Sequence, residues 1–339
     1  MKTRTKLLPI AAIALSALTL TACSSAAPSS AKASHSITIS VVRQLSAGDY
    51  YQLWLQGAQA EAAKLGVKLN VSDANGVDAQ QALNLQTAVN NKPDAIVVDH
   101  GFAATIDPGI SAAIAAKIPV VAFDVDPGQN KVVTIDQSDA TIGKQITGQL
   151  VKDTGGKAEV IYVYVAGYAP LDKRNAVWTQ VKKANPGLKQ VAQIGAVDSN
   201  TDAEVADQAK AVLQANPNVT AILAPYDEFA KGATLAVNEL GLQNKVKVYG
   251  ADISTADIGV LTAAGSPWVA TSATDPANVG AVAIRAAYLK ATHKSVAALI
   301  EVPPALITQA DLRTKKVATL AELLKAFPQL NTPNIAPVK

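Results

Sequence analysis

The chain of 339 residues contains a single cysteine, Cys23, and only three histidines, His35, His100 and His293. One cysteine excludes an intramolecular disulfide and a site built from several thiolates. Three histidines scattered along the chain do not form a typical zinc site, which needs several ligands held close together. We therefore expect neither a bound metal nor another cofactor.

Sequence motifs of several enzyme classes are also missing. The chain has no Gly-x-Gly-x-x-Gly, no Gly-x-x-x-x-Gly-Lys-Ser/Thr, no Gly-x-Ser-x-Gly and no His-Glu-x-x-His. His100 beside Asp99 is the only conceivable general base, and no evident nucleophile accompanies it. The sequence therefore favours a protein that is not an enzyme.

An excess of charge of one sign is absent once the N-terminal segment is set aside. The whole chain has 30 basic and 27 acidic residues, and Lys2, Arg4 and Lys6 account for the excess. The remaining sequence is balanced, which argues against nucleic acid as a partner.

The N-terminal segment has the features of an export signal. The three basic residues precede an apolar stretch, 7–20, which is too short for a comfortable membrane span. The following LTAC (20–23) resembles the lipobox of bacterial lipoproteins. This resemblance implies a signal peptide over 1–23, lipidation of Cys23 and anchoring of the exported protein to the outer face of the cell membrane, or a periplasmic location. Residues 24–36 are expected to form a flexible linker.

From Ile37 onward, short β-rich runs alternate with Ala-rich amphipathic stretches. Most of the β-rich runs are continuously apolar, as in parallel strands that are covered on both faces. Expected strands lie at 37–42, 67–72, 95–99, 120–124, 132–136, 159–165, 190–197, 219–224, 245–251 and 268–274, with helices such as 50–65 and 203–216 between them. The repeat predicts doubly wound α/β sheets, and about 300 residues after the signal suggest two domains.

Aromatic and acidic residues gather after the predicted strands, where ligands bind in such sheets. The aromatic members are Tyr50, Tyr51, Trp54, Phe102, Tyr168, Tyr226 and Phe229; the acidic ones are Asp99, Asp124, Asp126, Asp198, Asp227, Asp252 and Asp275; and His100 and Arg174 accompany them. Aromatic rings suit the apolar face of a sugar, while carboxylates and arginine suit its hydroxyls. The ensemble indicates a neutral sugar or polyol, although Asp227 alone is also explained as a helix cap.

The stretch VVAFDVDPG (120–128) raises an enzymatic alternative. Asp124-Val125-Asp126 is similar to the nucleophile motif of haloacid-dehalogenase-type phosphatases. The residues that follow, Pro127-Gly128, depart from that motif, and Asp124 comes after three βα units instead of on the first strand. A phosphohydrolase remains an alternative hypothesis. Asp126 either shares ligand binding with Asp124 or shapes the turn.

Six stretches together carry a more specific resemblance. They are GAQAEAAKLGV (57–67), IPVVAFD (118–124), KRNAVW (173–178), PYDEFAKGA (225–233), YGADIS (249–254) and ATDPANVG (273–280). In this order they make the chain from about 37 to 310 resemble the ribose-binding-protein type of periplasmic sugar-binding proteins, which serve ATP-binding-cassette (ABC) importers.

The resemblance implies two doubly wound parallel-sheet lobes joined by a three-strand hinge. The N-terminal lobe would comprise 37–137 plus 275–301, and the C-terminal lobe 138–274 plus 302–327, followed by a tail over 328–339. The crossings between the lobes are expected near 136–139, 272–276 and 300–304.

The resemblance also supplies site residues, which we combine with the residues noted above. The expected ligand-binding set is Tyr50, Tyr51, Trp54, His100, Asp124, Asp126, Arg174, Tyr226, Asp227, Asp252, Thr274 and Asp275. The chain departs from the ribose binders at Val125, where they have arginine, and at Gly48, where they have asparagine. Both departures favour a neutral ligand other than ribose.

We therefore expect an extracytoplasmic solute-binding protein of an ABC importer. It would be a monomer that captures a neutral monosaccharide or polyol by hinge closure and delivers it to a permease with its ATPase. Besides the phosphohydrolase, a sensory receptor for a furanose signal or a nucleoside remains an alternative.

Overall fold

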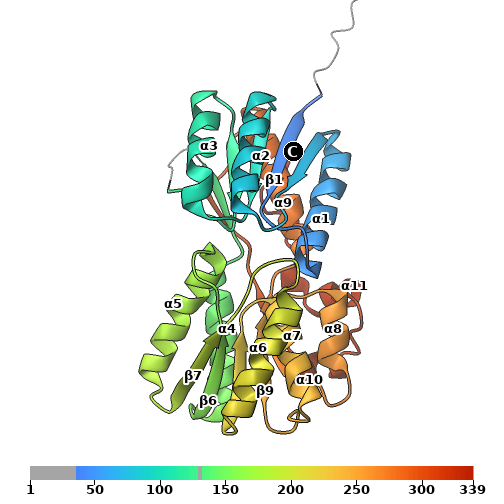
Figure 1. The fold of residues 1–339 in the computed structure, drawn as a ribbon. Coiled ribbons are helices and arrows are strands. Elements are labelled where there is room, and N and C mark those ends of the chain that lie inside the picture. Colours follow the sequence, from blue (N-terminus) through green and yellow to red (C-terminus); the bar gives the residue numbers. More distant parts are fainter. Residues whose placement is uncertain (1–35, 129–131, 339) are drawn as a thin grey trace, which may run out of the picture. The chain divides into compact units, whose positions relative to one another are not determined.

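The computed structural model describes residues 36–128 and 132–338, drawn as a coloured ribbon in Figure 1. The predicted signal peptide, the lipidation site at Cys23 and the linker over 24–36 lie outside the described residues. Within the two described ranges, no helix combines the length and the apolar character that crossing a membrane requires.

Six parallel strands form the first sheet, in the order β11-β5-β4-β3-β1-β2 (Figure 1). The strands are β1 (Thr38–Arg43), β2 (Lys68–Asp73), β3 (Ala95–Asp99), β4 (Val120–Phe123), β5 (Val133–Asp136) and β11 (Leu299–Glu301). Helices α1 (Asp49–Leu65), α2 (Asp78–Asn90), α3 (Ala103–Ala115) and α9 (Pro276–Ala291) accompany it. Because helices cover both faces, β3 and β4 are buried along their whole length, which explains their continuously apolar sequences. We call this unit the N-terminal lobe.

The second sheet has the order β12-β10-β9-β8-β6-β7. Its strands are β6 (Ala158–Val163), β7 (Leu188–Ile194), β8 (Val219–Ala224), β9 (Lys247–Ala251), β10 (Trp268–Ala273) and β12 (Ala305–Thr308). Only β12 is antiparallel, to β10. The accompanying helices are α4 (Asp139–Thr154), α5 (Ala169–Ala184), α6 (Thr201–Ala215), α7 (Asp227–Glu239), α8 (Thr255–Thr262), α10 (Gln309–Thr314) and α11 (Leu320–Ala326), and the short 3-10 helix η1 (Pro328–Leu330) follows. We call this unit the C-terminal lobe.

The chain passes between the two sheets three times, at 137–138, 274–275 and 302–304. The predicted fold class, two α/β lobes with three connections, is therefore confirmed. Each strand that was expected from the sequence is present, with ends shifted by a few residues at most.

Two glycines allow α1 and α9 to pack with their backbones in contact. A Cβ atom at Gly57 would lie 1.9 Å from the carbonyl oxygen of Ala277, and one at Gly280 would lie 2.0 Å from that of Trp54. Any larger residue at either position would push the helices apart. Since α9 follows the second crossing, this packing attaches a late segment of the chain to the first helix of the N-terminal lobe.

Three strands end in a residue with left-handed backbone conformation. His100 (φ 58°) follows β3, Asp124 (φ 49°) follows β4, and Asp252 (φ 66°) follows β9. Aspartate and histidine tolerate this conformation better than most residues do. The backbone N–H of Asp124 donates to the carbonyl of Ile135, and that of Asp252 to Ser272. These bonds to the adjacent strands fix the side chains at the carboxyl edges of the sheets.

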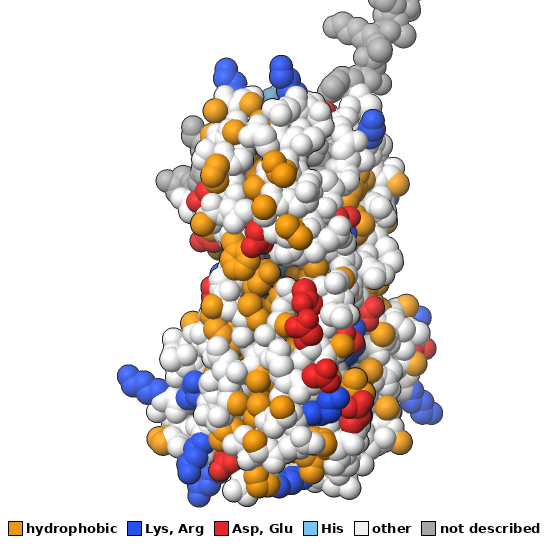
Figure 2. Space-filling model, viewed as in Figure 1, with side chains coloured by type: hydrophobic (Ala, Val, Ile, Leu, Met, Phe, Trp, Pro, Cys, Tyr) orange, Lys and Arg blue, Asp and Glu red, His pale blue; other side chains and the backbone are white. Residues whose placement is uncertain are grey.

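Contacts between the lobes include a small polar cluster around Asp49. One carboxylate oxygen of Asp49 lies 3.1 Å from Lys231 Nζ and accepts from Ser254 Oγ at 3.2 Å. The backbone N–H of Asp49 donates to Glu228 at 3.2 Å. On the face shown in Figure 2, Lys and Arg side chains gather near the two ends and acidic ones near the middle, so the basic groups form no continuous stripe there.

Candidate functional site

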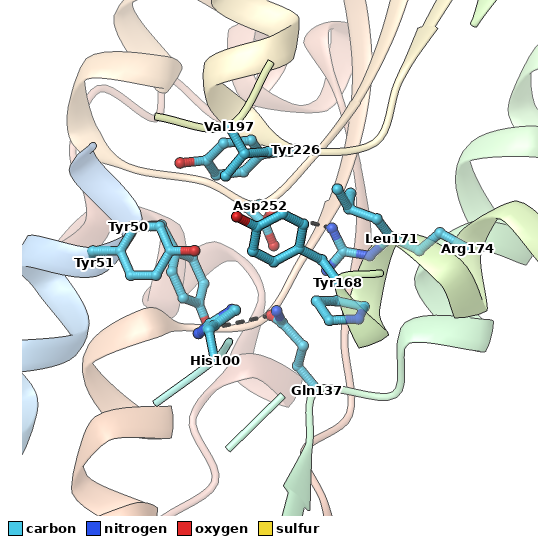
Figure 3. Close-up of a pocket in the computed structure, with 11 residues that line it drawn as sticks. Tyr50, Tyr51, His100, Gln137, Tyr168, Leu171, Arg174, Val197, Tyr226 and Asp252 are labelled. Carbon is cyan, nitrogen blue, oxygen red and sulfur yellow. Dashed lines mark hydrogen bonds and ion pairs between the residues drawn. The ribbon is translucent and has the colours of Figure 1, made fainter. Parts of the chain in front are cut away.

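A cavity with an empty volume of about 390 Å³, part of it open to solvent, lies at the carboxyl edges of the two sheets. The lining residues come from both lobes and from the first crossing: Tyr50, Tyr51, His100, Gln137, Tyr168, Pro170, Leu171, Arg174, Val197, Tyr226 and Asp252 (Figure 3). Six members of the predicted ligand-binding set are among them.

The N-terminal lobe contributes two tyrosines from the first turn of α1. Gly48 precedes the helix with φ 92°, a conformation that favours glycine, and a Cβ there would lie 3.1 Å from both Tyr226 Oη and Glu228 Oε1. This turn brings Tyr50 and Tyr51 into edge-to-face contact at 5.9 Å between ring centroids. Burial raises the pKa of both hydroxyls well above the usual value, so the tyrosines are neutral hydrogen-bonding groups.

His100 is oriented by Asp99, the last residue of β3. Its Nδ1 lies 2.6 Å from Asp99 Oδ1, and the other oxygen of Asp99 accepts from Arg43 Nε. A carboxylate in an ion pair accepts hydrogen bonds, so the proton of the imidazole resides on Nδ1. Nε2 then lies 3.7 Å from Asp124 Oδ2.

Asp124 is buried next to the lining residues Gln137 and His100 and does not itself line the cavity. Its Oδ2 accepts from Gln137 Nε2 at 2.7 Å, while Oδ1 has no hydrogen-bond partner among the described residues. Burial raises its pKa well above the usual range, and the neighbouring carboxylates Asp139 and Asp136 add to the effect. Asp124 therefore offers a desolvated oxygen that is suited to a ligand hydroxyl.

Arg174 connects the carboxylates of the C-terminal lobe. Its Nε donates to Asp139 Oδ1 at 3.0 Å, and its Nη1 donates to the carbonyl of Pro225 at 2.7 Å and to Asp252 Oδ2 at 3.3 Å. Burial raises the pKa of Asp252, and the guanidinium of Arg174 opposes that rise. Asp252 Oδ1 is buried and, within the described part of the chain, has no hydrogen-bond partner.

Aromatic and aliphatic side chains of the C-terminal lobe form the remaining wall. Tyr168 stands at the start of α5, and its ring lies 4.7 Å from that of Phe102 in the N-terminal lobe. Pro170 and Leu171 follow in the first turn of α5, Val197 lies in the loop after β7, and Tyr226 precedes α7. This wall can cover the apolar face of a ligand.

The structure does not bring the whole predicted set to the cavity wall. Trp54 is fully buried and stacks on Phe123 at 5.7 Å, and Asp126 is exposed and accepts from the backbone N–H of Gly128. Asp275 caps α9 by accepting from the N–H of Ala277. Asp126 thus shapes its turn, and its separate orientation removes the paired aspartates that a phosphatase motif would need.

Thr274 and Asp227 lie behind the residues that line the cavity. Thr274 Oγ1 donates to Gln137 Oε1 at 3.0 Å, so it orients the amide that holds Asp124. Asp227 is fully buried; its Oδ1 accepts from the N–H of Glu228, and Oδ2 has no partner among the described residues.

Five lining residues are absent from the predicted ligand-binding set: Gln137, Tyr168, Pro170, Leu171 and Val197. Tyr168 belongs to the aromatic residues that follow predicted strands, so its position in the sequence already indicated a place near the ligand. Gln137 follows β5 at the first crossing, where polar side chains meet the hinge. The three aliphatic residues give no signal, because nothing in their local sequence separates them from core residues.

Asp124, Asp136 and Asp139 present carboxylate oxygens within 4.8 Å of one another. Two of the three already have cationic partners, since Lys173 Nζ lies 2.5 Å from Asp136 and Arg174 pairs with Asp139. The hydrogen bond and charge of Lys173 lower the pKa of Asp136 in spite of its burial. The cluster is therefore an ion-pair network that borders the cavity.

Comparison with known proteins agrees with this architecture. Residues 39–295 match the model of the periplasmic binding protein domain. The ribose import binding protein of Bacillus subtilis is 27% identical over 238 residues, which cover 68% of this chain and 76% of that protein. The D-apiose import binding protein of Actinobacillus succinogenes is 28% identical, over 74% of this chain and 76% of that protein.

Solved structures give the same result. A 5-methylthioribose transporter solute binding protein from Thermotoga lettingae, in complex with 5-methylthioribose, is 39% identical with a TM-score of 0.87, over 89% of this chain and 96% of that one. An ABC transporter solute binding protein from Agrobacterium vitis with bound allitol is 28% identical with a TM-score of 0.77, over 83% and 99%. On this evidence, the chain belongs to the periplasmic binding protein family.

Proposed function

We propose that the protein is an extracytoplasmic solute-binding protein of an ABC importer that captures a neutral sugar or polyol between its lobes. The carrying observation is a cavity in which aromatic rings adjoin Asp252, whose buried Oδ1 has no hydrogen-bond partner among the described residues. A second such oxygen, Asp124 Oδ1 of the other lobe, lies next to the wall, since Asp124 contacts the lining residues Gln137 and His100. A polyhydroxylated ligand that donates to both oxygens links the lobes and stabilises their closure around it.

The ligands of similar proteins support this ligand class. The structure at 39% identity holds 5-methylthioribose, and the structure at 28% identity holds allitol. Both molecules are uncharged and carry neighbouring hydroxyls. In this protein, Arg174 is already paired with Asp139 and Asp252, which leaves little cationic charge for a phosphate group.

Delivery requires partners that recognise the ligand-bound form. We propose a membrane permease with its ATPase as the recipient, and a monomeric binding protein held at the outer face of the membrane by a lipid on Cys23. Mass spectrometry of membrane-associated protein tests the anchor, because lipidation gives a defined mass increase that Cys23→Ser abolishes. Unmodified, fully soluble mature protein would contradict the anchor and leave ligand binding unaffected.

Ligand binding is tested by thermal unfolding and calorimetry against pentoses, hexoses and polyols, with a metal chelator present. Binding of a neutral sugar or polyol raises the unfolding temperature, because only the folded protein binds it. Replacement of Asp124 and Asp252 together by asparagine is expected to abolish the rise. A protein that responds to none of these compounds would refute the proposed function.

A further inference from the structure

The two ends of the cavity differ in chemistry. Figure 3 shows His100 and Gln137 at one end, near the hinge, and Val197 and Tyr226 at the other, with Asp252 between them. Two buried carboxylate oxygens without hydrogen-bond partners among the described residues, Asp124 Oδ1 and Asp252 Oδ1, belong to the first end and the middle, and Tyr226 Oη at the other end also lacks such a partner. We call the wall of the C-terminal lobe that Tyr168, Pro170, Leu171, Val197 and Tyr226 form, and that includes this other end, the outer end.

The outer end offers few hydrogen bonds to a ligand. Pro170, Leu171 and Val197 have no polar side-chain atom. The hydroxyl of Tyr168 already lies 3.3 Å from Gln44 Nε2, which donates to it. The hydroxyl of Tyr226 lies beside Gly48 of the N-terminal lobe, is buried and has no hydrogen-bond partner among the described residues, so it remains available to a ligand.

This apolar wall is held in place by its own local structure. The loop that carries Val197 is fixed because the N–H of Asp198 donates to Thr201 Oγ1 and the N–H of Asn200 donates to Asp198 Oδ1, at 2.9 and 2.6 Å. Tyr168 packs against Phe102 of the other lobe. The outer end is thus a formed surface and does not depend on a mobile side chain for its shape.

We infer that the outer end is a specificity subsite for an apolar substituent, so that the ligand is a pentose-sized sugar whose ring hydroxyls face Asp124, Asp252 and Arg174 and whose remote carbon carries a short alkyl or thioether group. This inference rests on the proposed function and narrows it. A hydroxyl at the outer end loses its water and finds mainly the hydroxyl of Tyr226 as a partner, which weakens its binding relative to that of an apolar group. An apolar group there gains affinity by about fourfold for each buried methylene, and a thioether also contacts aromatic rings favourably.

A matched ligand series tests the subsite by calorimetry. The probes are D-ribose derivatives that carry hydroxyl, hydrogen, methylthio, ethylthio or phosphate on C5. We expect the methylthio compound to bind at least about tenfold more tightly than the hydroxyl compound, with hydrogen between them and the phosphate weakest. Equal affinity for the hydroxyl and methylthio compounds would overturn the subsite and leave the proposed function intact. Failure of every probe and of other neutral sugars would instead refute the proposed function.

A near-isosteric variant separates the subsite from general effects on folding. Val197→Thr adds a hydroxyl to the outer end, and we expect it to lower the preference for methylthio over hydroxyl by about threefold to tenfold. Val191→Thr is the matched control, because Val191 is partly buried on β7 and does not line the cavity. An unchanged preference in Val197→Thr, or an equal loss in the control, would contradict the assignment. Since the readout is a ratio of two affinities, a moderate loss of stability does not affect it.

Discussion

Asp124 and Asp252 occupy corresponding places in the two lobes and have different surroundings. Each follows a strand, β4 or β9, adopts a left-handed conformation and donates its backbone N–H to the adjacent strand. Asp252 lies 3.3 Å from the guanidinium of Arg174, whereas Asp124 is held by the neutral amide of Gln137. The same backbone arrangement therefore presents one ion-paired carboxylate and one without a direct cationic partner.

This difference shows how the two lobes divide their tasks. The ion pair with Arg174 favours the charged form of Asp252, opposing the effect of burial, and holds its side chain in place. Asp124 is held near two other carboxylates, and its raised pKa reflects a charge that the folded protein stabilises poorly. Hydrogen bonds from ligand hydroxyls compensate this charge, so Asp124 has more to gain from the ligand than Asp252 has.

Among the substitutions that bear on this difference, removal of the Arg174 side chain is expected to lower the free energy of unfolding most. Arg174→Leu leaves Asp139 and Asp252 without their buried partner, which should lower the free energy of unfolding by about 3–5 kcal/mol. Urea denaturation at neutral pH measures the change. Arg174→Lys should lose less stability, because it keeps the charge but not the forked geometry. A loss below about 1 kcal/mol for Arg174→Leu would show that the ion pair does not hold Asp252.

Neutralising Asp124 and neutralising Asp252 should change the free energy of unfolding in opposite directions. At pH 8 Asp124→Asn should stabilise the unliganded protein by roughly 1 kcal/mol, because it removes a poorly stabilised charge and still accepts from Gln137. Asp252→Asn should destabilise it by a similar amount through loss of the ion pair. Both should weaken sugar binding about tenfold or more. If both variants were stabilised, or both destabilised, the proposed difference between the surroundings of Asp124 and Asp252 would be contradicted.

The pH dependence of the free energy of unfolding tests the protonation of Asp139, the other carboxylate that pairs with Arg174. Burial raises the pKa of Asp139 to about 6, although Arg174 opposes the shift. Below about pH 4 the group is protonated in both the folded and unfolded states, and between about pH 4 and 6 only the folded state retains the proton. Its contribution to stability is therefore present at low pH and lost as the pH rises through 6, by about 3 kcal/mol for a shift from 3.8 to about 6. Denaturation of Asp139→Asn across pH 4–8 should lack this component, and an identical profile would refute it.

The cluster around Asp49 should have the smallest effect. Asp49→Asn weakens a partly exposed pair with Lys231 between the lobes, so we expect a twofold to fivefold loss of sugar affinity, or about 0.5–1 kcal/mol. The loss should diminish in high salt. Asp207→Asn is the control, since its pair with Lys210 lies within α6, and it should leave affinity unchanged. A loss for Asp49→Asn as large as that for Asp124→Asn would mean that the interior carboxylates are not the dominant link between the lobes.

The sequence allowed the fold to be predicted because its elements are locally encoded. Continuous apolar runs mark the buried parallel strands, and prolines such as Pro119 and Pro267 mark the entries into β4 and β10. The site was less accessible to prediction. The rule that ligand-binding residues follow strands selected Tyr50, Asp124 and Asp252. It also selected residues with structural roles, such as Asp275, which caps α9.

The unpredicted part of the site depends on side-chain direction and on contacts between distant segments. Trp54 is one turn beyond Tyr50 and Tyr51, yet it faces Phe123 in the core and not the cavity. Val197 lines the cavity from a loop that is held by the hydrogen bond from the N–H of Asp198 to Thr201. Neither fact follows from the local sequence, since both are set by packing between elements that are far apart in the chain.

The contact of Gly57 with α9 has a consequence for how the protein acquires its structure. Helix α1 lies near the beginning of the chain, and its partner Pro276–Ala291 comes more than two hundred residues later. The edge strand β11 arrives later still. The N-terminal lobe therefore cannot be completed until nearly the whole polypeptide has emerged, whereas most of the C-terminal lobe is contiguous. We expect the half of the molecule that is made first to be the half that finishes folding last.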